Sequence, residues 1–272
     1  MSDRVGSALS GDLPVGVFDS GIGGLTVLKE IRRLLPHEHL LYLGDTARVP
    51  YGTKSPEVVR RYSELNVRFL LEKKVKTVVV ACNTASSLAL DYLEDLFPGI
   101  PVMGVITPVI RNLALLSGVR RIGVIGTTAT IRSNRYQQLI REQQQVEVLS
   151  QACPLFVPFV EEGLIDHSLT RQVIDHYLRD LKRADIDTLI LACTHYPLLS
   201  AMIDEYFDHR VRIIDSAYYT ALELKKRLES DQLLNPSSEE GRESFFVTDT
   251  IETFKETATR FFGRPLLNIQ HI

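Results

Sequence analysis

Short apolar runs alternate with longer amphipathic segments along this chain, and this alternation constrains its fold more than any other feature. Residues 14–20, 39–45 and 76–82 are mainly aliphatic runs, and the segments 24–35 and 56–74 between them have helical periodicity. The short runs are continuously apolar rather than alternating with polar residues, which is typical of parallel strands covered by helices on both faces. The sequence therefore predicts an α/β fold built from open, mainly parallel sheets.

The second half of the chain repeats the first. The run at 121–126 is similar to the run at 14–19, so that Gly123 corresponds to Gly16. The runs TVVVAC and TLILAC end on Cys82 and Cys193, and a helical segment precedes each of them. The repeat predicts two pseudo-symmetric α/β lobes that face each other across a central cleft.

The last part of the chain has no counterpart in the second half. It contains a helical segment that begins near residue 216, a polar loop at 233–244, and then a strand and a helix that ends at Gly263. We expect it to return to the first lobe, which would then comprise residues 12–107 and 216–272, with 108–215 as an inserted second lobe. Residues 1–11 are expected to form a flexible polar tail.

Composition limits the classes of partner. The net charge of −3 gives no case for a nucleic acid or an anionic membrane surface. No apolar stretch approaches the roughly 18 residues that span a bilayer, and the N-terminus lacks the apolar core of a signal peptide, so we expect a cytoplasmic protein. The three cysteines form no CxxC pair, which predicts free thiols rather than a disulfide framework or a zinc ribbon.

Polar residues follow each of the marked strands. In open α/β sheets, ligands bind beyond the carboxyl ends of the strands. The residues at these positions are Asp19, Ser20, Asp45, Pro50, Tyr51, Gly52, Cys82, Asn83, Thr84, Cys193, Thr194 and His195. If the lobes face each other, Cys82 and Cys193 lie on opposite sides of one cleft.

Two opposed thiols suit a particular reaction. Inversion of a stereocentre by proton transfer requires a base on one face of the carbon and an acid on the other. A thiol with an ordinary pKa of about 8.5 can be shifted towards a thiolate near neutrality by a histidine or a helix N-terminus, and it is then a competent general base.

Five motifs resemble the glutamate racemases of the cofactor-independent aspartate/glutamate racemase superfamily. They are FDSGIGGLTV, GDTARVPYG, ACNTAS, CPLFVPFVEEG and ACTHYP, in this order, and the resemblance runs from about residue 14 to the C-terminus. It implies two α/β lobes around a buried site, with the final segment packed on the first lobe. It also implies interconversion of L- and D-glutamate with no cofactor and no metal, as a supply of D-glutamate for bacterial peptidoglycan. We also expect a homodimer.

The resemblance assigns roles by position. Cys82 and Cys193 match the two catalytic thiols, of which the first takes the proton from D-glutamate and the second from L-glutamate. Asp19, Glu161 and His195 match groups that assist these thiols. The implied substrate contacts are Asp19, Ser20, Pro50, Tyr51, Gly52, Cys82, Asn83, Thr84, Cys193, Thr194 and His195.

Other interpretations stay open at this point. A single strand-end cysteine is more often a buried apolar residue than a catalytic one, and Cys153, which has no duplicate, is expected to be one. The SGIGG segment could cradle a phosphate, Asp45 could only cap a turn, and Cys82, Cys193 and His195 could hold zinc.

For the protein as a whole, an aspartate racemase, a two-lobed binding module without chemistry and a redox dithiol protein are the alternatives. The polar N-terminal extension leaves open whether a cell-wall precursor activates the enzyme.

Overall fold

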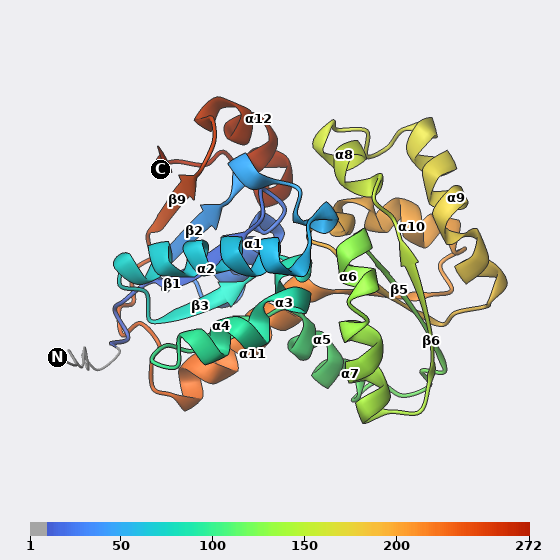
Figure 1. Ribbon diagram of the computed structural model, residues 1–272, viewed down its shortest axis with the longest axis horizontal. Helices are drawn as coiled ribbons and strands as arrows, with labels where there is room; N and C mark the ends of the chain where they lie inside the picture. The colour runs from blue at the N-terminus through green and yellow to red at the C-terminus, as the bar shows by residue number, and fades with distance from the viewer. Residues whose placement is uncertain (1–9) are drawn as a thin grey trace.

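A computed structural model describes residues 10–272 and contains two sheets over this range, in which every strand pairing is parallel (Figure 1). The first sheet has the order β10-β9-β2-β1-β3-β4 and the second has the order β6-β5-β7-β8. The strands of the first sheet are β1 (Val15–Asp19), β2 (Leu40–Gly44), β3 (Thr77–Val80), β4 (Val102–Gly104), β9 (Glu243–Val247) and β10 (Ile269–His271). Those of the second are β5 (Arg121–Gly126), β6 (Glu147–Ala152), β7 (Thr188–Ala192) and β8 (Arg212–Asp215). The predicted α/β class with parallel sheets is confirmed.

The two sheets have the same internal topology. In the first sheet β2, β1, β3 and β4 lie side by side, and in the second β6, β5, β7 and β8 lie in the corresponding places. Gly16 is in β1 and Gly123 is in the equivalent β5, while Cys82 and Cys193 follow the equivalent strands β3 and β7. The repeat seen in the sequence is therefore a repeat of topology.

Helices cover both faces of the first sheet because successive side chains of its strands point to opposite faces. Val15 and Val17 of β1 join the apolar core that contains α1, α11 and α12, whereas Phe18 joins the core that contains α2 and α4. The helices are α1 (Leu25–Leu34), α2 (Pro56–Glu72), α3 (Asn83–Leu88), α4 (Leu90–Leu96), α5 (Ile106–Leu113), α6 (Thr128–Arg132), α7 (Arg135–Gln143), α8 (Phe156–Glu161), α9 (Ser168–Arg183), α10 (Ser200–Tyr206), α11 (Ser216–Ser230) and α12 (Ile251–Phe262). Three short 3₁₀ helices, η1 (Thr46–Arg48), η2 (Tyr51–Thr53) and η3 (Tyr196–Leu199), follow strand ends within the described range.

The C-terminal segment lies in the first sheet. β9 pairs with β2, and β10 pairs with β9 at the sheet edge. α12 ends where Gly263 takes a left-handed φ of 89°, as its position in the sequence predicts. The short strand β10 was not expected from the sequence, because three residues are too few to show a period.

The chain passes between the sheets at two places. The first is α5, which follows β4, and the second is the junction of β8 with α11. α11 packs on both α1 and α5. The predicted boundary between residues 107 and 108 falls inside α5, and the one between residues 215 and 216 falls where β8 joins α11. The division of the chain into two folding units stays a prediction. Of the predicted N-terminal tail, residues 1–9 lie outside the described residues.

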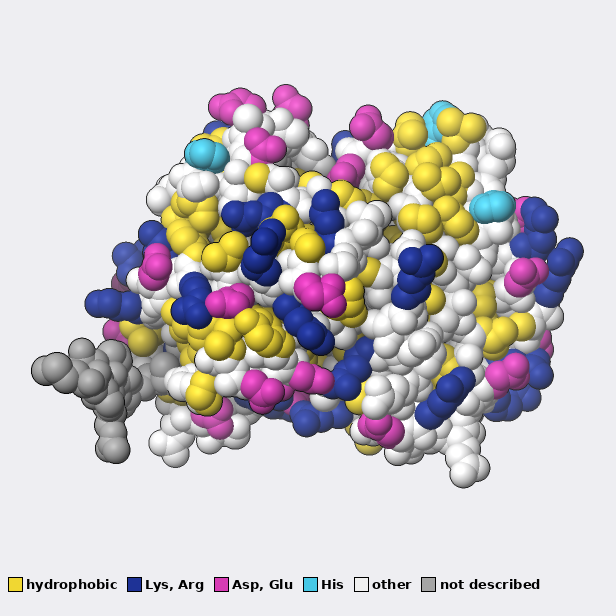
Figure 2. All heavy atoms as spheres, viewed as in Figure 1, with side chains coloured by type: hydrophobic (Ala, Val, Ile, Leu, Met, Phe, Trp, Pro, Cys, Tyr) yellow, Lys and Arg dark blue, Asp and Glu magenta, His cyan; other side chains and the backbone are white. Residues whose placement is uncertain are grey.

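The surface carries charges of both signs. On the face shown in Figure 2, lysine and arginine side chains are interspersed with aspartate and glutamate side chains. Within residues 10–272, no helix combines the length and the apolar character needed to cross a membrane.

Candidate active site

One small buried cavity lies where the carboxyl ends of the two sheets meet. Both Cys82 and Cys193 line it, each with only 5 % of its surface exposed. Its volume is about 30 Å³, which is room for about one water molecule. The full lining is Ser20, Val49, Pro50, Tyr51, Gly52, Cys82, Asn83, Thr84, Thr127, Val157, Cys193, Thr194 and His195. The cavity thus brings together all the predicted substrate-contacting residues except Asp19.

Burial dominates the chemistry of the two thiols. Cys82 caps α3, where the Ala85 N–H lies 3.5 Å from its Sγ atom, and Ser20 Oγ lies 3.6 Å away. Desolvation nevertheless raises the pKa of Cys82 to about 11, and desolvation also raises the pKa of Cys193. A helix N-terminus or a histidine can lower the pKa of a thiol, but in this closed form burial outweighs such contributions and the pKa of both thiols is raised. The free-energy cost of burying a thiolate is larger than the stabilisation that these hydrogen-bond donors give to it.

Asp19 lies directly behind the cavity. Its side chain is fully buried, and one carboxylate oxygen accepts a hydrogen bond from the Gly21 N–H at 3.0 Å, while the other has no partner among the described residues. Burial raises the pKa of Asp19, although neighbouring His195 opposes the effect. An acid held in this way can exchange a proton with a neighbouring group more readily than a solvated carboxylate.

His195 and Glu161 form a pair. His195 Nε2 lies 2.8 Å from Glu161 Oε1, and the imidazole ring packs edge-on against Phe261 of α12 at 5.1 Å between centroids. Arg260 of α12 donates to the backbone oxygens of Val160 and Glu161. Glu161 itself does not line the cavity, and it reaches the site only through His195.

Asp45 does not line the cavity either, and its side chain makes no capping bond to η1. It accepts hydrogen bonds from Tyr51, Arg48 and Thr248 instead. Asn66 donates to the Tyr51 hydroxyl at 3.1 Å. The interpretation of Asp45 as a turn cap is wrong, because its carboxylate anchors Tyr51 in the cavity wall.

The two lobes touch closely around the cavity. A Cβ atom on Gly23 would lie 2.3 Å from Thr194 Oγ1, and one on Gly52 would lie 2.7 Å from Thr127 Cβ. Thr84 Oγ1 lies 2.9 Å from Thr127 Oγ1, across the boundary between the sheets. The absence of side chains at Gly23 and Gly52 is what permits this approach.

Sequence reasoning missed three lining residues, Val49, Thr127 and Val157. The repeat contained the signal for Thr127, because aligning Gly123 with Gly16 places Thr127 opposite Ser20. Val49 and Val157 carry no such signal. They are apolar residues on loops or short helices whose position depends on tertiary packing.

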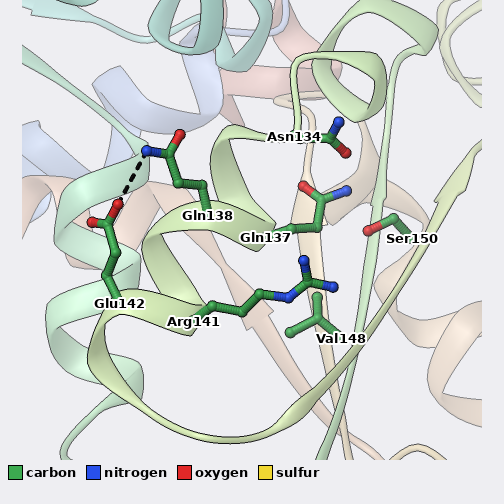
Figure 3. Close-up of a pocket in the computed structure, with 7 residues that line it drawn as sticks. All are labelled: Asn134, Gln137, Gln138, Arg141, Glu142, Val148 and Ser150. Atoms are coloured by element: carbon green, nitrogen blue, oxygen red, sulfur yellow. Dashed lines mark hydrogen bonds between the residues drawn. The ribbon is translucent and has the colours of Figure 1, made fainter.

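Two other features lie away from this cavity. Cys153 is fully buried, lies outside the lining and is close to the backbone oxygen of Gln151, in accordance with a packing role. A wider groove of about 610 Å³ lies between α7 and β6, with Gln137 and Arg141 directed towards Val148 and Ser150 (Figure 3). It contains none of the predicted site residues. Among residues 10–272, no three His, Cys, Asp or Glu side chains are grouped as metal ligands would be.

Known proteins share this sequence and architecture. The sequence pattern of the family described as Asp/Glu/Hydantoin racemase matches residues 15–224. The glutamate racemase of Geobacter metallireducens is 48% identical over 259 residues, which cover 95% of this chain and 96% of that protein. The glutamate racemase of Chlorobaculum tepidum is 45% identical over 96% of this chain and 97% of its own length.

Solved structures of racemases share the architecture of this chain. Glutamate racemase from Francisella tularensis in complex with D-glutamate has a TM-score of 0.91 at 35% identity and covers 96% of this chain and 98% of its own. The Thermus thermophilus glutamate racemase in complex with β-chloro-D-alanine has a TM-score of 0.88 at 45% identity, covering 97% and 98%. The Picrophilus torridus aspartate racemase, at 20% identity and a TM-score of 0.56, shares the fold. The resemblance found in the motifs is confirmed, and the chain belongs to the Asp/Glu/hydantoin racemase family.

Proposed function

We propose that this protein interconverts L- and D-glutamate by proton transfer at the α-carbon between Cys82 and Cys193. The observation that carries the proposal is that two cysteines from equivalent strands of opposite lobes line one buried cavity. Relatives named glutamate racemase are 42–51% identical to the chain, which supports glutamate as the substrate. Aspartate racemase is the second candidate, and the aspartate racemase structure from Picrophilus torridus supports no more than a common fold.

The reaction balances without any other reagent. In the D-to-L direction, the Cys82 thiolate removes the α-proton, and the Cys193 thiol donates its proton to the opposite face of the carbanion. The enzyme is left with a Cys82 thiol and a Cys193 thiolate, which is the form required for the reverse direction. Because the substrate gives one proton to Cys82 and receives another from Cys193, no atom changes oxidation state and the reaction as written needs neither an oxidant nor a cofactor.

One thiol must first lose its proton, although burial raises the pKa of both. The α-ammonium group of the substrate brings a positive charge into the cavity and stabilises a thiolate there. We propose that Asp19 assists Cys82 and that the His195–Glu161 pair assists Cys193. Burial raises the pKa of Cys193, and the His195 backbone N–H, which offsets part of that rise, acts in the same direction.

The remaining lining residues would hold the substrate. Ser20, Asn83, Thr84 and Thr194 supply hydroxyl and amide groups for its charged ends, and Pro50, Tyr51 and Gly52 form the wall behind them. The closed cavity is too small for an amino acid. We therefore propose that the lobes separate to admit glutamate and close again before proton transfer.

The biological setting is also a proposal. The product D-glutamate would supply peptidoglycan synthesis. The homodimer and the cytoplasmic location expected from the sequence stay predictions.

Circular dichroism of L-glutamate incubated with the purified protein tests the reaction directly. Cys82→Ala and Cys193→Ala should each racemise at least about a thousandfold more slowly, because inversion needs both groups. Cys153→Ala is the matched control, since it removes a buried thiol outside the cavity, and it should keep its activity. Substantial racemisation by either active-site variant would refute the mechanism, and activity lost on exhaustive chelation would refute the cofactor-free claim.

Deuterium exchange tests which thiol serves which enantiomer. In deuterated water, Cys193→Ala retains Cys82 and should slowly exchange the α-proton of D-glutamate. Cys82→Ala retains Cys193 and should exchange that of L-glutamate. The opposite preference would overturn the assignment of roles.

A further inference from the structure

Tyr136 connects the second lobe to a residue of the cavity in the first lobe. It lies in the first turn of α7 and is 1 % exposed, and its hydroxyl donates to Asn83 Oδ1 at 2.6 Å. Asn83 is the first residue of α3, directly after Cys82. Tyr136 does not itself line the cavity, whereas Asn83 does.

This hydrogen bond fixes the orientation of the Asn83 amide. Burial and the neighbouring Asp215 carboxylate raise the pKa of Tyr136, so its hydroxyl keeps its proton and can donate. With Oδ1 committed to Tyr136, the NH₂ group is directed the other way. Asn83 Nδ2 is buried and has no hydrogen-bond partner among the described residues.

An unpaired buried NH₂ group is costly, because it has lost its water and gained nothing in return. A carboxylate in the cavity would accept its hydrogens in a charge-assisted bond, which is shorter and stronger than a neutral one. The reversed amide would present its carbonyl oxygen to the cavity and would repel a carboxylate.

We propose that Tyr136 is a positioning residue that orients the Asn83 amide so that its NH₂ group binds a carboxylate of the substrate. This inference rests on the proposed function. Because α7 follows a strand of the second sheet and α3 follows a strand of the first, the bond joins the two lobes in this closed form. The amide is thus held in its binding orientation in the form in which Cys82 and Cys193 line one cavity.

Tyr136→Phe removes the hydroxyl and keeps the ring in the core. Loss of one oriented, charge-assisted hydrogen bond should raise KM for D- and L-glutamate about tenfold. The bond acts on bound substrate and transition state alike, so kcat should change by less than about threefold. Tyr206→Phe is the matched control, since it also deletes a hydroxyl bonded to a side-chain oxygen, that of Asp175, away from the cavity. Its KM and kcat should stay within about twofold of wild type.

A double-mutant cycle separates positioning from general weakening of the fold. If Tyr136 acts through Asn83, Tyr136→Phe should raise KM by less than about twofold in an Asn83→Ala background. Effects of Tyr136→Phe that are equal in the two backgrounds would overturn the proposal.

Asn83→Asp keeps the oxygen that accepts from Tyr136 but replaces the NH₂ group by a second oxygen. This variant provides a test that does not depend on whether the Tyr136→Phe variant folds. It should raise KM at least as much as Asn83→Ala, and wild-type KM in Asn83→Asp would overturn the proposal. Calorimetric binding of D-glutamate distinguishes the two levels of inference. Wild-type protein that binds D-glutamate without racemising it would refute the proposed function. The double-mutant cycle of Tyr136 and Asn83 would then be measured with the Kd for D-glutamate in place of KM. Protein that does not bind glutamate would overturn both.

Discussion

Gly23 is the position where the two lobes approach each other most closely beside the site. A Cβ atom there would lie 2.3 Å from Thr194 Oγ1 and 2.4 Å from His195 Nδ1. Neither side chain can swing away freely. Thr194 and His195 are each 5 % exposed, and the histidine is held by Glu161 and Phe261. Gly23→Ala should therefore move the loop that follows Cys193 or hold the lobes apart.

The magnitude follows from the geometry. Ordinary contact begins near 3.4 Å, so the atoms facing the new methyl group must move by about 1 Å. A displacement of that size next to a reacting group can cost about a hundredfold in rate. Overpacking typically destabilises by about 1–3 kcal/mol, which for a protein of this size lowers Tm by several degrees. We expect kcat/KM for glutamate to fall about a hundredfold, with a measurable fall in Tm.

Gly99→Ala is the control. No atom lies within 4 Å of a Cβ at this position, and Gly99 has no positive φ. Coupled-enzyme kinetics in both directions, together with a thermal melt, would be measured for both variants. Gly23→Ala with kcat/KM within twofold of wild type and an unchanged Tm would refute the reasoning that close contact of the lobes positions Cys193.

Three further predictions concern specificity and stability. Glutamate should exceed aspartate in kcat/KM by at least about a hundredfold, because its longer chain places a carboxylate on dedicated donors; comparable rates would favour aspartate racemase. Lys76→Met should lower the free energy of unfolding by about 3–5 kcal/mol in denaturant melts, since it leaves the fully buried partner Glu38 without a counter-charge; an unchanged midpoint would contradict this. Burial raises the pKa of Asp215 from 3.8 to about 6, so stability from this group is present below pH 4 and is lost as pH rises through 6. Asp215→Asn, which can still cap α11 at Ala217, should match wild type at pH 4 and exceed its free energy of unfolding by about 3 kcal/mol at pH 8; equal or lower stability at pH 8 would contradict this.

The sequence by itself determined the class of fold and the identity of the central residues. Continuous apolar runs such as TVVV and TLIL are local signals, and they predicted β3 and β7 at the right places. The repeat placed Cys82 and Cys193 at equivalent strand ends, and the parallel sheets then brought these ends to one cavity. Such signals can be read from sequence because strand formation and side-chain periodicity depend on residues that are close in the chain.

Only the tertiary structure decided how the surroundings of the thiols are built. Glu161 meets His195 through the packing of α8 against η3, the 3₁₀ helix that follows His195, and Tyr136 reaches Asn83 from the other lobe. The pKa of Cys82 depends on how completely both lobes exclude water, which no local pattern records. These features arise from contacts between residues far apart in sequence, and their distances and burial are set by the packing of whole elements rather than by any neighbour in the chain.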